Sequence, residues 1–190
     1  MTFSSDLVFD GFLNKPYHEN DPVNPINIYG KSKANAEVSV MTENNESLII
    51  RTSAFFGPWD KYNFVYQVLE SLRGNNIFKA AEDIIISPTY IPDLVNVSLD
   101  LLIDNEVGIW HLSNHGEVSW AEFAINVAEK AHLNTNLIHP YPQISLGFVA
   151  ERPSYSVLNS IKGVLMPTLE NAIERYFEER KSFVESIIVK

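Results

Sequence analysis

The strongest constraint on the fold of this chain is the order in which two hydrophobic patterns alternate along it. Short apolar runs with the length of buried strands are separated by longer segments whose apolar residues recur at helical spacing. The runs are residues 3–9, 47–52, 108–112 and 137–139, and the helical segments are residues 25–42, 64–72, 93–102, 120–131 and 168–179. Strands that alternate with helices predict an α/β protein with a largely parallel sheet.

Capping residues predict where several of these helices begin and end. Asn24 followed by Pro25 is typical of an N-cap and a first helical position. Asp93 and Ser119 are the predicted N-caps of two further helices, because a short polar side chain can accept a hydrogen bond from a free backbone N–H. Gly74 is the predicted end of the helix that starts near residue 64.

The composition excludes several classes of protein. With 45% apolar and 12% aromatic residues among 190, the chain can bury a core and fits one domain. Its formal net charge of −10 argues against nucleic acid or an anionic membrane as the main partner. The sequence has no cysteine, no apolar run near the ~18 residues that span a bilayer, and no signal-peptide pattern. We therefore expect a cytoplasmic protein without a membrane segment.

The five histidines show no pattern of metal ligands. No pair has the helical spacing of a zinc site, so we expect no metal. His111 lies in a run that is apolar on both sides, and we predict a core histidine whose hydrogen bonds are satisfied.

The stretch INIYGKSKANAE, residues 26–37, suggests chemistry because it places Tyr29 and Lys33 one helical turn apart. A phenol with a pKa of about 10 exchanges protons poorly near neutral pH, and a neighbouring ammonium group favours the phenolate. Such a pair can protonate the oxyanion formed from a ketone, given a hydroxyl to hold the oxygen and a hydride source. Ser4 and Ser5 lie at the end of the first strand, where parallel sheets place their sites. Spacing alone leaves open an amphipathic helix and two serines without a role.

A series of stretches resembles the extended short-chain dehydrogenase/reductase family and, more narrowly, the dTDP-4-dehydrorhamnose reductases and their sugar-nucleotide relatives. In chain order they are SSDLVFDG, PYHENDPVNP, IYGKSKANAE, IIRTS, Asn63-Phe64, SPTYIPDL, GIWHLSNHGEVSWAEFA and RPSYSVLNS. The resemblance covers nearly the whole chain. Ser5 precedes Tyr29 by 24 residues, the spacing between the catalytic hydroxyl residue and the tyrosine in those reductases, which usually carry threonine there.

The resemblance implies catalytic roles for three residues. Tyr29 would be the general acid, Lys33 would activate it and bind the nicotinamide ribose, and Ser5 would hydrogen-bond the sugar carbonyl. The hydride would come from NADPH or NADH, because no side chain can supply one. The resemblance also implies that Arg51, Thr52 and Ser53 approach the nicotinamide.

Substrate contacts are implied for Ser5, Asp6, Ala54, Asn63, Thr89 and Arg152. Arg152 is the implied partner of a pyrophosphate, because its planar fork suits phosphate oxygens. Ala54 departs from the family, since the rhamnose-forming reductases carry tryptophan after Arg-Thr-Ser. A methyl group in place of an indole widens the pocket and leaves the identity of the sugar open.

Structural alternatives remain for several of these residues. Asn63 fits the N-cap of a helix equally well, and Arg51 fits a surface ion pair. Glu37, four residues after Lys33, is expected to pair with that lysine on the helix face.

The sequence lacks the glycine-rich turn of a dinucleotide site, since no two of its eight glycines are three residues apart. Together with the family resemblance, this absence implies that residues 1–190 form a single partial domain, the C-terminal part of a Rossmann-like doubly wound parallel sheet plus a small α/β substrate-binding part. Residues 1–60 would be the remnant of the Rossmann domain with the active-site helix. Residues 61–190 would hold mainly the substrate-binding part and returning Rossmann elements.

The predicted function is reduction of the 4-keto group of a dTDP-6-deoxy sugar with NAD(P)H, performed by a longer protein of which this chain is a fragment or domain. The chain alone is expected to be inactive. The predicted partners are a nucleotide-diphosphate sugar and a missing N-terminal Rossmann half or another chain, with a homodimer left open. The alternative is a non-catalytic sugar-nucleotide-binding or regulatory module that resembles the regulatory β subunit of methionine adenosyltransferase.

Overall fold

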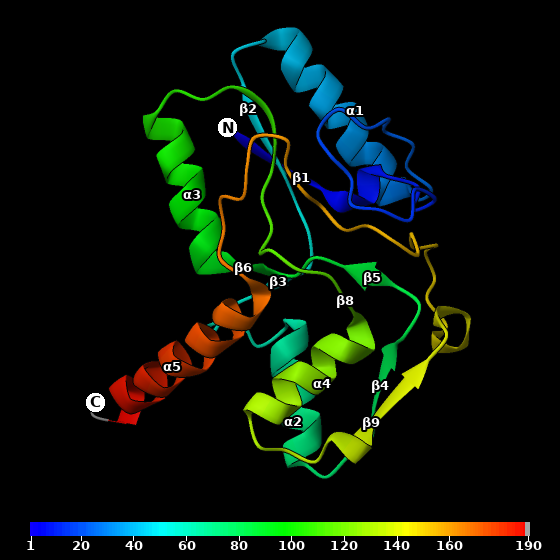
Figure 1. Ribbon diagram of the computed structural model, residues 1–190, viewed down its shortest axis with the longest axis vertical. Coiled ribbons are helices and arrows are strands. Elements are labelled where there is room, and N and C mark those ends of the chain that lie inside the picture. Colours follow the sequence, from blue (N-terminus) through cyan, green and yellow to red (C-terminus); the bar gives the residue numbers. More distant parts are fainter. Residues whose placement is uncertain (189–190) are drawn as a thin grey trace.

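The computed structural model describes the backbone of residues 1–188 and the side chains of residues 1–181, and its elements form two parts (Figure 1). The sheet part contains β1 (Thr2–Ser5), α1 (Ile28–Glu43), β2 (Leu48–Thr52), α3 (Ile91–Ile103) and β7 (Gly108–His111). The helical part contains α2 (Phe64–Arg73), β4 (Phe78–Ala81), α4 (Trp120–Lys130), β9 (Ile138–Tyr141) and α5 (Leu169–Ile188).

A three-stranded parallel sheet in the order β1-β2-β7 forms the centre of the sheet part. Successive residues of a strand point to opposite faces. Ile50 of β2 accordingly packs with Leu94 and Leu101 of α3, whereas the next residue, Arg51, pairs with Glu37 of α1. Helices therefore cover both faces of the parallel strands, which confirms the predicted α/β class and the doubly wound, Rossmann-like arrangement.

The helical part has its own apolar core, in which α2, α4 and α5 pack around aromatic rings. Phe56 contacts Phe123 of α4 edge-on, with ring centroids 5.4 Å apart, and Tyr176 of α5 closes the same cluster. Short strand pairs connect this core to the sheet part: β3 (Phe55–Phe56) pairs with β6 (Thr89–Tyr90), and β5 (Ile85–Ile86) pairs with β8 (Val118–Ser119). The proposed boundary near residue 60 stays a prediction.

The first strand is shorter than its apolar run predicts. The strand ends at Ser5 because the Ser5 side chain accepts a hydrogen bond from the Leu7 N–H and starts the 3₁₀ turn η1 (Asp6–Val8). The prediction that Asn24 caps α1 is also wrong. The side chain of Asn27 caps this helix by accepting the N–H of Gly30 at 2.8 Å, whereas Asn24 bonds to Asp10.

Other predicted ends are closer to the structure. Gly74 ends α2 and Ser119 caps α4, in a reciprocal capping box with Glu122, as predicted. The predicted cap Asp93 instead lies inside the first turn of α3, which already begins at Ile91. The last helix, α5, extends beyond the predicted end at residue 179 to Ile188. No helix in the described part of the chain has the length and apolarity required to cross a membrane.

A segment that we name the strap, residues 151–160, leads from the helical part back to the sheet part (Figure 1). The side chain of Asn27 donates to the Glu151 carbonyl at 2.9 Å, and the backbone of Tyr17 pairs with Val157 and Asn159. Ile85 bonds to Ser154 and Ser156 from the other side. The strap thereby holds the two parts together at the place where β1 and β2 end.

Candidate active site

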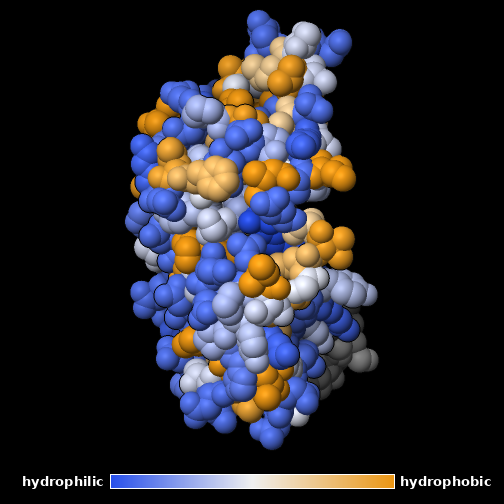
Figure 2. All heavy atoms as spheres, turned by 90° about the vertical axis from the view of Figure 1, so that its right-hand side faces the viewer, coloured by the Kyte–Doolittle hydropathy of each residue, from blue (hydrophilic) through white to orange (hydrophobic). Residues whose placement is uncertain are grey.

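A cleft of about 290 Å³ lies at the carboxyl ends of β1 and β2, where the sheet part meets the helical part. Ligand sites of parallel sheets occur at this edge. The predicted residues that line it are Ser5, Asp6, Tyr29, Thr52, Ser53, Ala54 and Arg152. Figure 2 shows the face on the right-hand side of Figure 1, where apolar patches lie above and below a hydrophilic band at mid height.

Tyr29 reaches the cleft because the start of α1 packs closely against η1. A Cβ atom at Gly30 would lie 2.0 Å from the Leu7 carbonyl oxygen, so only glycine permits this approach. Tyr29 is 51% exposed. The Lys33 ammonium lies 5.8 Å from the Tyr29 ring centroid and donates a hydrogen bond to the Phe3 carbonyl at 3.1 Å. Lys33 is thus beside Tyr29, as the helical spacing predicts, although it does not line the cleft itself.

Asp6 is a buried carboxylate in the cleft wall, with 6% exposure. Its Oδ1 accepts the Ser5 hydroxyl at 3.0 Å, and its Oδ2 accepts the hydroxyls of Ser53 at 2.9 Å and Ser156 at 2.6 Å. Burial raises the pKa of the Asp6 carboxyl above its ordinary value, although the three serine hydrogen bonds act in the opposite direction. The sequence did not indicate Ser156, which lies 150 residues from Asp6 in the strap.

The opposite wall of the cleft is apolar. Ile84, Ile86 and Trp120 come from the helical part, and Ala54 faces this wall from the end of β2. Ala54 has a φ of 42°, in the left-handed region that residues other than glycine rarely adopt. Its carbonyl accepts the N–H of Thr89 at 3.1 Å, which holds the turn in place.

Arg51 lies outside the cleft, although it precedes Thr52 directly. Its guanidinium is 2% exposed and donates two hydrogen bonds to Glu37, at 2.9 and 2.7 Å. Arg51 therefore forms neither the expected surface ion pair nor a wall of the cleft. The prediction that Glu37 pairs with Lys33 is wrong, because the strand alternation brings Arg51 under α1.

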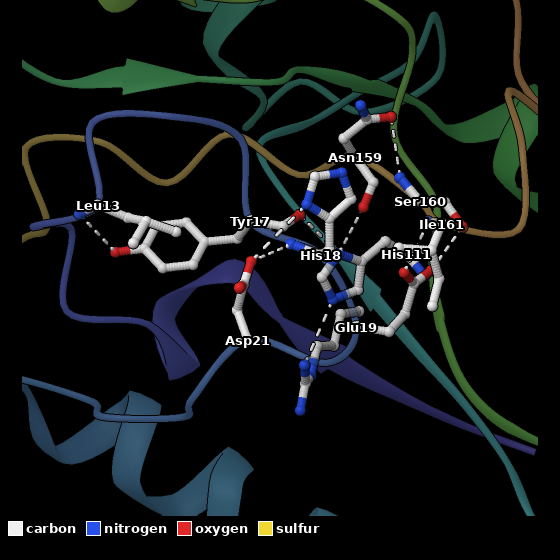
Figure 3. A network of polar contacts seen from close by, with 10 residues as sticks. Leu13, Tyr17, His18, Glu19, Asp21, His111, Asn159, Ser160 and Ile161 are labelled. Atoms are coloured by element: carbon white, nitrogen blue, oxygen red, sulfur yellow. Dashed lines mark hydrogen bonds and ion pairs between the residues drawn. The ribbon is translucent and has the colours of Figure 1, made fainter.

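His111 continues this interior network (Figure 3). Its Nδ1 faces the carbonyl oxygens of Tyr17 and Asn159, at 3.1 and 2.9 Å, and therefore carries the proton. Its Nε2 then accepts from Arg51 Nη1 at 3.3 Å. Burial lowers the pKa of His111 to about 4. These contacts confirm the prediction of a satisfied core histidine. Figure 3 also shows Glu19, whose carboxylate accepts the backbone N–H of His111.

Asn63 and Thr89 also have structural roles and do not line the cleft. Asn63 caps α2 by accepting the Tyr66 N–H at 3.0 Å, and its amide donates to the Gly57 carbonyl at 2.9 Å. Thr89 is fully buried, with its hydroxyl 3.2 Å from that of Thr52.

An aromatic groove of about 430 Å³ adjoins the cleft and shares Trp120 and Arg152 with it. Other residues of this groove are Tyr62, Phe64, Gln67, Phe78, Lys79 and Phe148. The Arg152 guanidinium lies 4.6 Å from the Phe148 ring centroid. Sequence reasoning missed the groove, because its aromatic residues are scattered from residue 62 to residue 148 and have no common spacing.

Two larger hollows lie along α4 and α5, with volumes of about 700 and 840 Å³. Their walls mix acidic and basic side chains and include none of the predicted site residues. Within the described part of the chain, no three His, Cys, Asp or Glu side chains gather as metal ligands would. The smaller cleft is the better candidate site because it joins a tyrosine, a buried carboxylate and an arginine at the end of a parallel sheet.

Comparison with known proteins identifies relatives of the whole described fold. The family model "RmlD substrate binding domain" matches residues 1–182. The spore coat polysaccharide biosynthesis protein SpsK of Bacillus subtilis is 36% identical over 183 residues, which are 94% of this chain and 64% of that protein. A dTDP-4-dehydrorhamnose reductase of Aggregatibacter actinomycetemcomitans is 35% identical over 170 residues, which are 84% of this chain and 58% of the relative.

A solved structure shows the same arrangement. The crystal structure of dTDP-4-dehydrorhamnose reductase from Bacillus anthracis in complex with NADP superposes with a TM-score of 0.88 at 35% identity. The match covers 93% of this chain and 64% of that one. The chain thus spans roughly three fifths of the length of these relatives, between 58% and 64%.

Proposed function

The chain belongs to the RmlD substrate binding domain family, and we propose that it provides the acid-base residues and the nucleotide-sugar site of an NAD(P)H-dependent 4-ketoreductase. The observation that carries this proposal is the placement of Tyr29, Ser5 and Arg152 around one cleft at the end of a parallel sheet. The relatives named as dTDP-4-dehydrorhamnose reductases support the same class of substrate.

The two adjoining cavities fit the two ends of a nucleotide-diphosphate sugar. We propose that the sugar occupies the cleft beside Tyr29 and that the base lies among the rings of the aromatic groove, such as Phe64 and Phe78. Arg152 borders both cavities, where its guanidinium can hold the diphosphate between them. The small side chain of Ala54 leaves room at the apolar wall, and the particular 6-deoxy sugar stays open.

The chemistry assigned to the chain is proton transfer and orientation. Tyr29 gives its hydroxyl proton to the oxygen of the reacting carbon, and the Lys33 ammonium beside it favours the phenolate that remains. Ser5 hydrogen-bonds the same oxygen. Trp120 and the isoleucines of the apolar wall exclude water from this end of the cleft. A nicotinamide bound beside Tyr29 and Lys33 would supply the hydride for the carbonyl carbon.

Among residues 1–181, those in and beside the cleft fit one end of such a cofactor. The adjacent Tyr29 and Lys33 can meet the hydroxyls of a ribose. At Gly30, in the first turn of α1, the Leu7 carbonyl oxygen occupies the space that a Cβ atom would take, which leaves no room there for a pyrophosphate. We propose that the pyrophosphate cradle comes from an N-terminal Rossmann half or another chain. The free edge of β1, with Phe3 39% exposed, is where it would join, and a homodimer contact is the alternative.

Isothermal titration of the chain with dTDP, a dTDP-4-keto-6-deoxyhexose and NADPH tests these assignments. We expect binding of the dTDP ligands and weak or absent binding of NADPH. Arg152→Met should weaken dTDP binding about tenfold or more, because a charge-assisted bond to phosphate is lost. Arg73→Met, a change of an exposed arginine on α2, is the matched control. No affinity for either dTDP ligand would contradict the proposal and favour a regulatory module that binds no sugar nucleotide.

A further inference from the structure

The least usual feature of the cleft is the set of hydrogen bonds around Asp6. A buried carboxylate normally pairs with a cation or with backbone N–H groups. The side chain of Asp6 instead meets the hydroxyls of Ser5, Ser53 and Ser156, and no ion pair within the described part of the chain includes it. Tyr29 and Arg152 are the other titratable groups that line the same cleft.

These bonds determine what the Ser5 hydroxyl can do. A serine hydroxyl has one proton and two lone pairs. An ionised carboxylate only accepts, so the Ser5 proton points to Asp6 Oδ1, and one lone pair of Ser5 accepts the Leu7 N–H at 3.2 Å. Only one lone pair remains for a ligand. With Asp6 ionised, Ser5 can therefore accept from an alcohol and cannot donate to a carbonyl.

Protonation of Asp6 reverses this direction. The proton has its best position on Oδ1, because Oδ2 already accepts two serine hydroxyls. Oδ1–H then donates to the Ser5 oxygen, and the Ser5 proton becomes free to point into the cleft. Burial, which raises the pKa of Asp6, brings this change toward the neutral range.

We propose that Asp6 is a positioning residue that sets the direction of the Ser5 hydroxyl, so that Ser5 binds the alcohol form of the sugar when Asp6 is ionised and the keto form when Asp6 is protonated. The proposal rests on the proposed function for the identity of the ligand. It assigns to Asp6 no contact with the substrate, in contrast to the contact that the family resemblance implies.

Asp6→Asn separates this role from a structural one. The amide oxygen can still accept Ser53 and Ser156, while the amide nitrogen donates to Ser5 and imitates the protonated acid. The measurement is the ratio of affinities for a dTDP-4-keto-6-deoxyhexose and its 4-hydroxy counterpart, titrated without cofactor between about pH 5 and about pH 9. The diphosphate is common to both ligands, so its titration cancels in the ratio.

In the unchanged protein the affinity ratio should shift toward the keto sugar by about tenfold as the pH falls. This is the expected effect of gaining the hydrogen bond from Ser5 to the keto oxygen and removing the contact between two acceptors. In Asp6→Asn it should favour the keto sugar at every pH. Ser156→Ala should leave the affinity ratio unchanged at the lowest and highest pH and move the midpoint of its transition to higher pH. The reason is that the ionised Asp6 carboxylate loses a hydrogen-bond donor. Ser98→Ala, a change of a buried serine of α3, is the control and should match the unchanged protein.

Equal ratios for the unchanged protein and Asp6→Asn over the whole pH range would overturn the proposal. If neither sugar binds, the proposed function fails, and neutron diffraction from the deuterated chain still decides the direction of Ser5. At high pH the Ser5 deuteron should lie between its oxygen and Asp6 Oδ1. A deuteron that points into the cleft under these conditions would reject the role of Asp6.

Discussion

Asp6 in η1 and Glu37 in α1 are both buried carboxylates, but their partners differ in kind. Glu37 meets the guanidinium of Arg51 through two hydrogen bonds, and His111 holds the far side of that guanidinium. Asp6 meets three neutral hydroxyls at the wall of a cleft. The first carboxylate is ion-paired, whereas no ion pair in the described part of the chain includes the second.

This difference separates a network that stabilises the fold from one that responds to its surroundings. A paired charge is costly to break, because either partner alone is left buried. A carboxylate held by neutral donors keeps a pKa that burial has raised, so its charge depends on pH and on what occupies the cleft. Changes near Arg51 should therefore affect stability, whereas changes near Tyr29 and Asp6 should affect ligands and protons.

The largest effect is expected from Tyr29→Phe, measured in a preparation that reduces a dTDP-4-keto-6-deoxy sugar with NADPH. The change removes the proton donor and keeps the ring, so kcat should fall ~10²–10⁴-fold. Because Tyr29 is half exposed, the free energy of unfolding should change by less than about 0.5 kcal/mol. Turnover near that of the unchanged protein would remove Tyr29 from the mechanism and leave α1 with a structural role alone.

Arg51→Met should mainly lower the stability of the fold, in contrast to Tyr29→Phe, which should mainly lower kcat. It leaves the Glu37 carboxylate buried without its countercharge, and the free energy of unfolding measured by urea denaturation should fall by about 3–5 kcal/mol. The double change Glu37→Met with Arg51→Met should recover part of that loss, because no isolated charge remains.

An equal loss in the double variant would show that the carboxylate is not the source of the instability.

Lys33→Met is the contrasting change on the same helix. Its ammonium donates to the Phe3 carbonyl near the surface and belongs to no ion pair in the described part of the chain, so the effect on unfolding should stay below about 0.5 kcal/mol.

The parts of the site that the sequence predicted are those set by local rules. Helical spacing brings Tyr29 and Lys33 together, and the rule that parallel strands end at one edge brings Ser5 near Thr52. The parallel sheet, its covering helices and most helix ends followed from apolar periodicity and caps. The family resemblance added the proposed roles, which remain to be tested.

The burial of Arg51, which contradicts the expected surface ion pair, had a local signal in the sequence. Adjacent strand residues point to opposite faces, so Arg51 and Thr52 cannot both face the same side of the sheet. Glu37 lies one turn beyond Lys33 on α1, on the side of the helix that covers β2. The apolar residues Leu48, Ile49 and Ile50, which directly precede Arg51 in the run 47–52, already indicated a buried strand.

The serine contacts of Asp6 had no such signal. Ser53 and Ser156 are 47 and 150 residues away along the chain, and only the path of the strap brings them to one carboxylate. The two-residue strands β3, β5, β6 and β8 were also missed, because they are too short for a period of two to show.

Ser53→Ala is expected to have a smaller effect than Arg51→Met, and it tests selectively whether Asp6 is held by neutral hydroxyls. A hydrogen bond to an ionised group stabilises by about 1.5–3 kcal/mol and one to a neutral group by about 0.5–1.5 kcal/mol. The loss of stability in Ser53→Ala should therefore be larger at high pH, where Asp6 is ionised, than at low pH. The measurement is urea denaturation at several pH values, with Ser98→Ala as the control for loss of a buried hydroxyl.

The sign of the pH dependence follows from linkage. A carboxyl whose pKa is higher in the folded chain than its ordinary value of 3.8 binds its proton more tightly when folded. The contribution of Asp6 to the free energy of unfolding thus falls as the pH rises from about 3.8 through the folded value. Ser53→Ala raises the folded pKa further and should extend this fall to higher pH. A loss of stability that is equal at all pH values would mean that Ser53 contributes packing alone and that its hydroxyl does not stabilise the ionised form of Asp6.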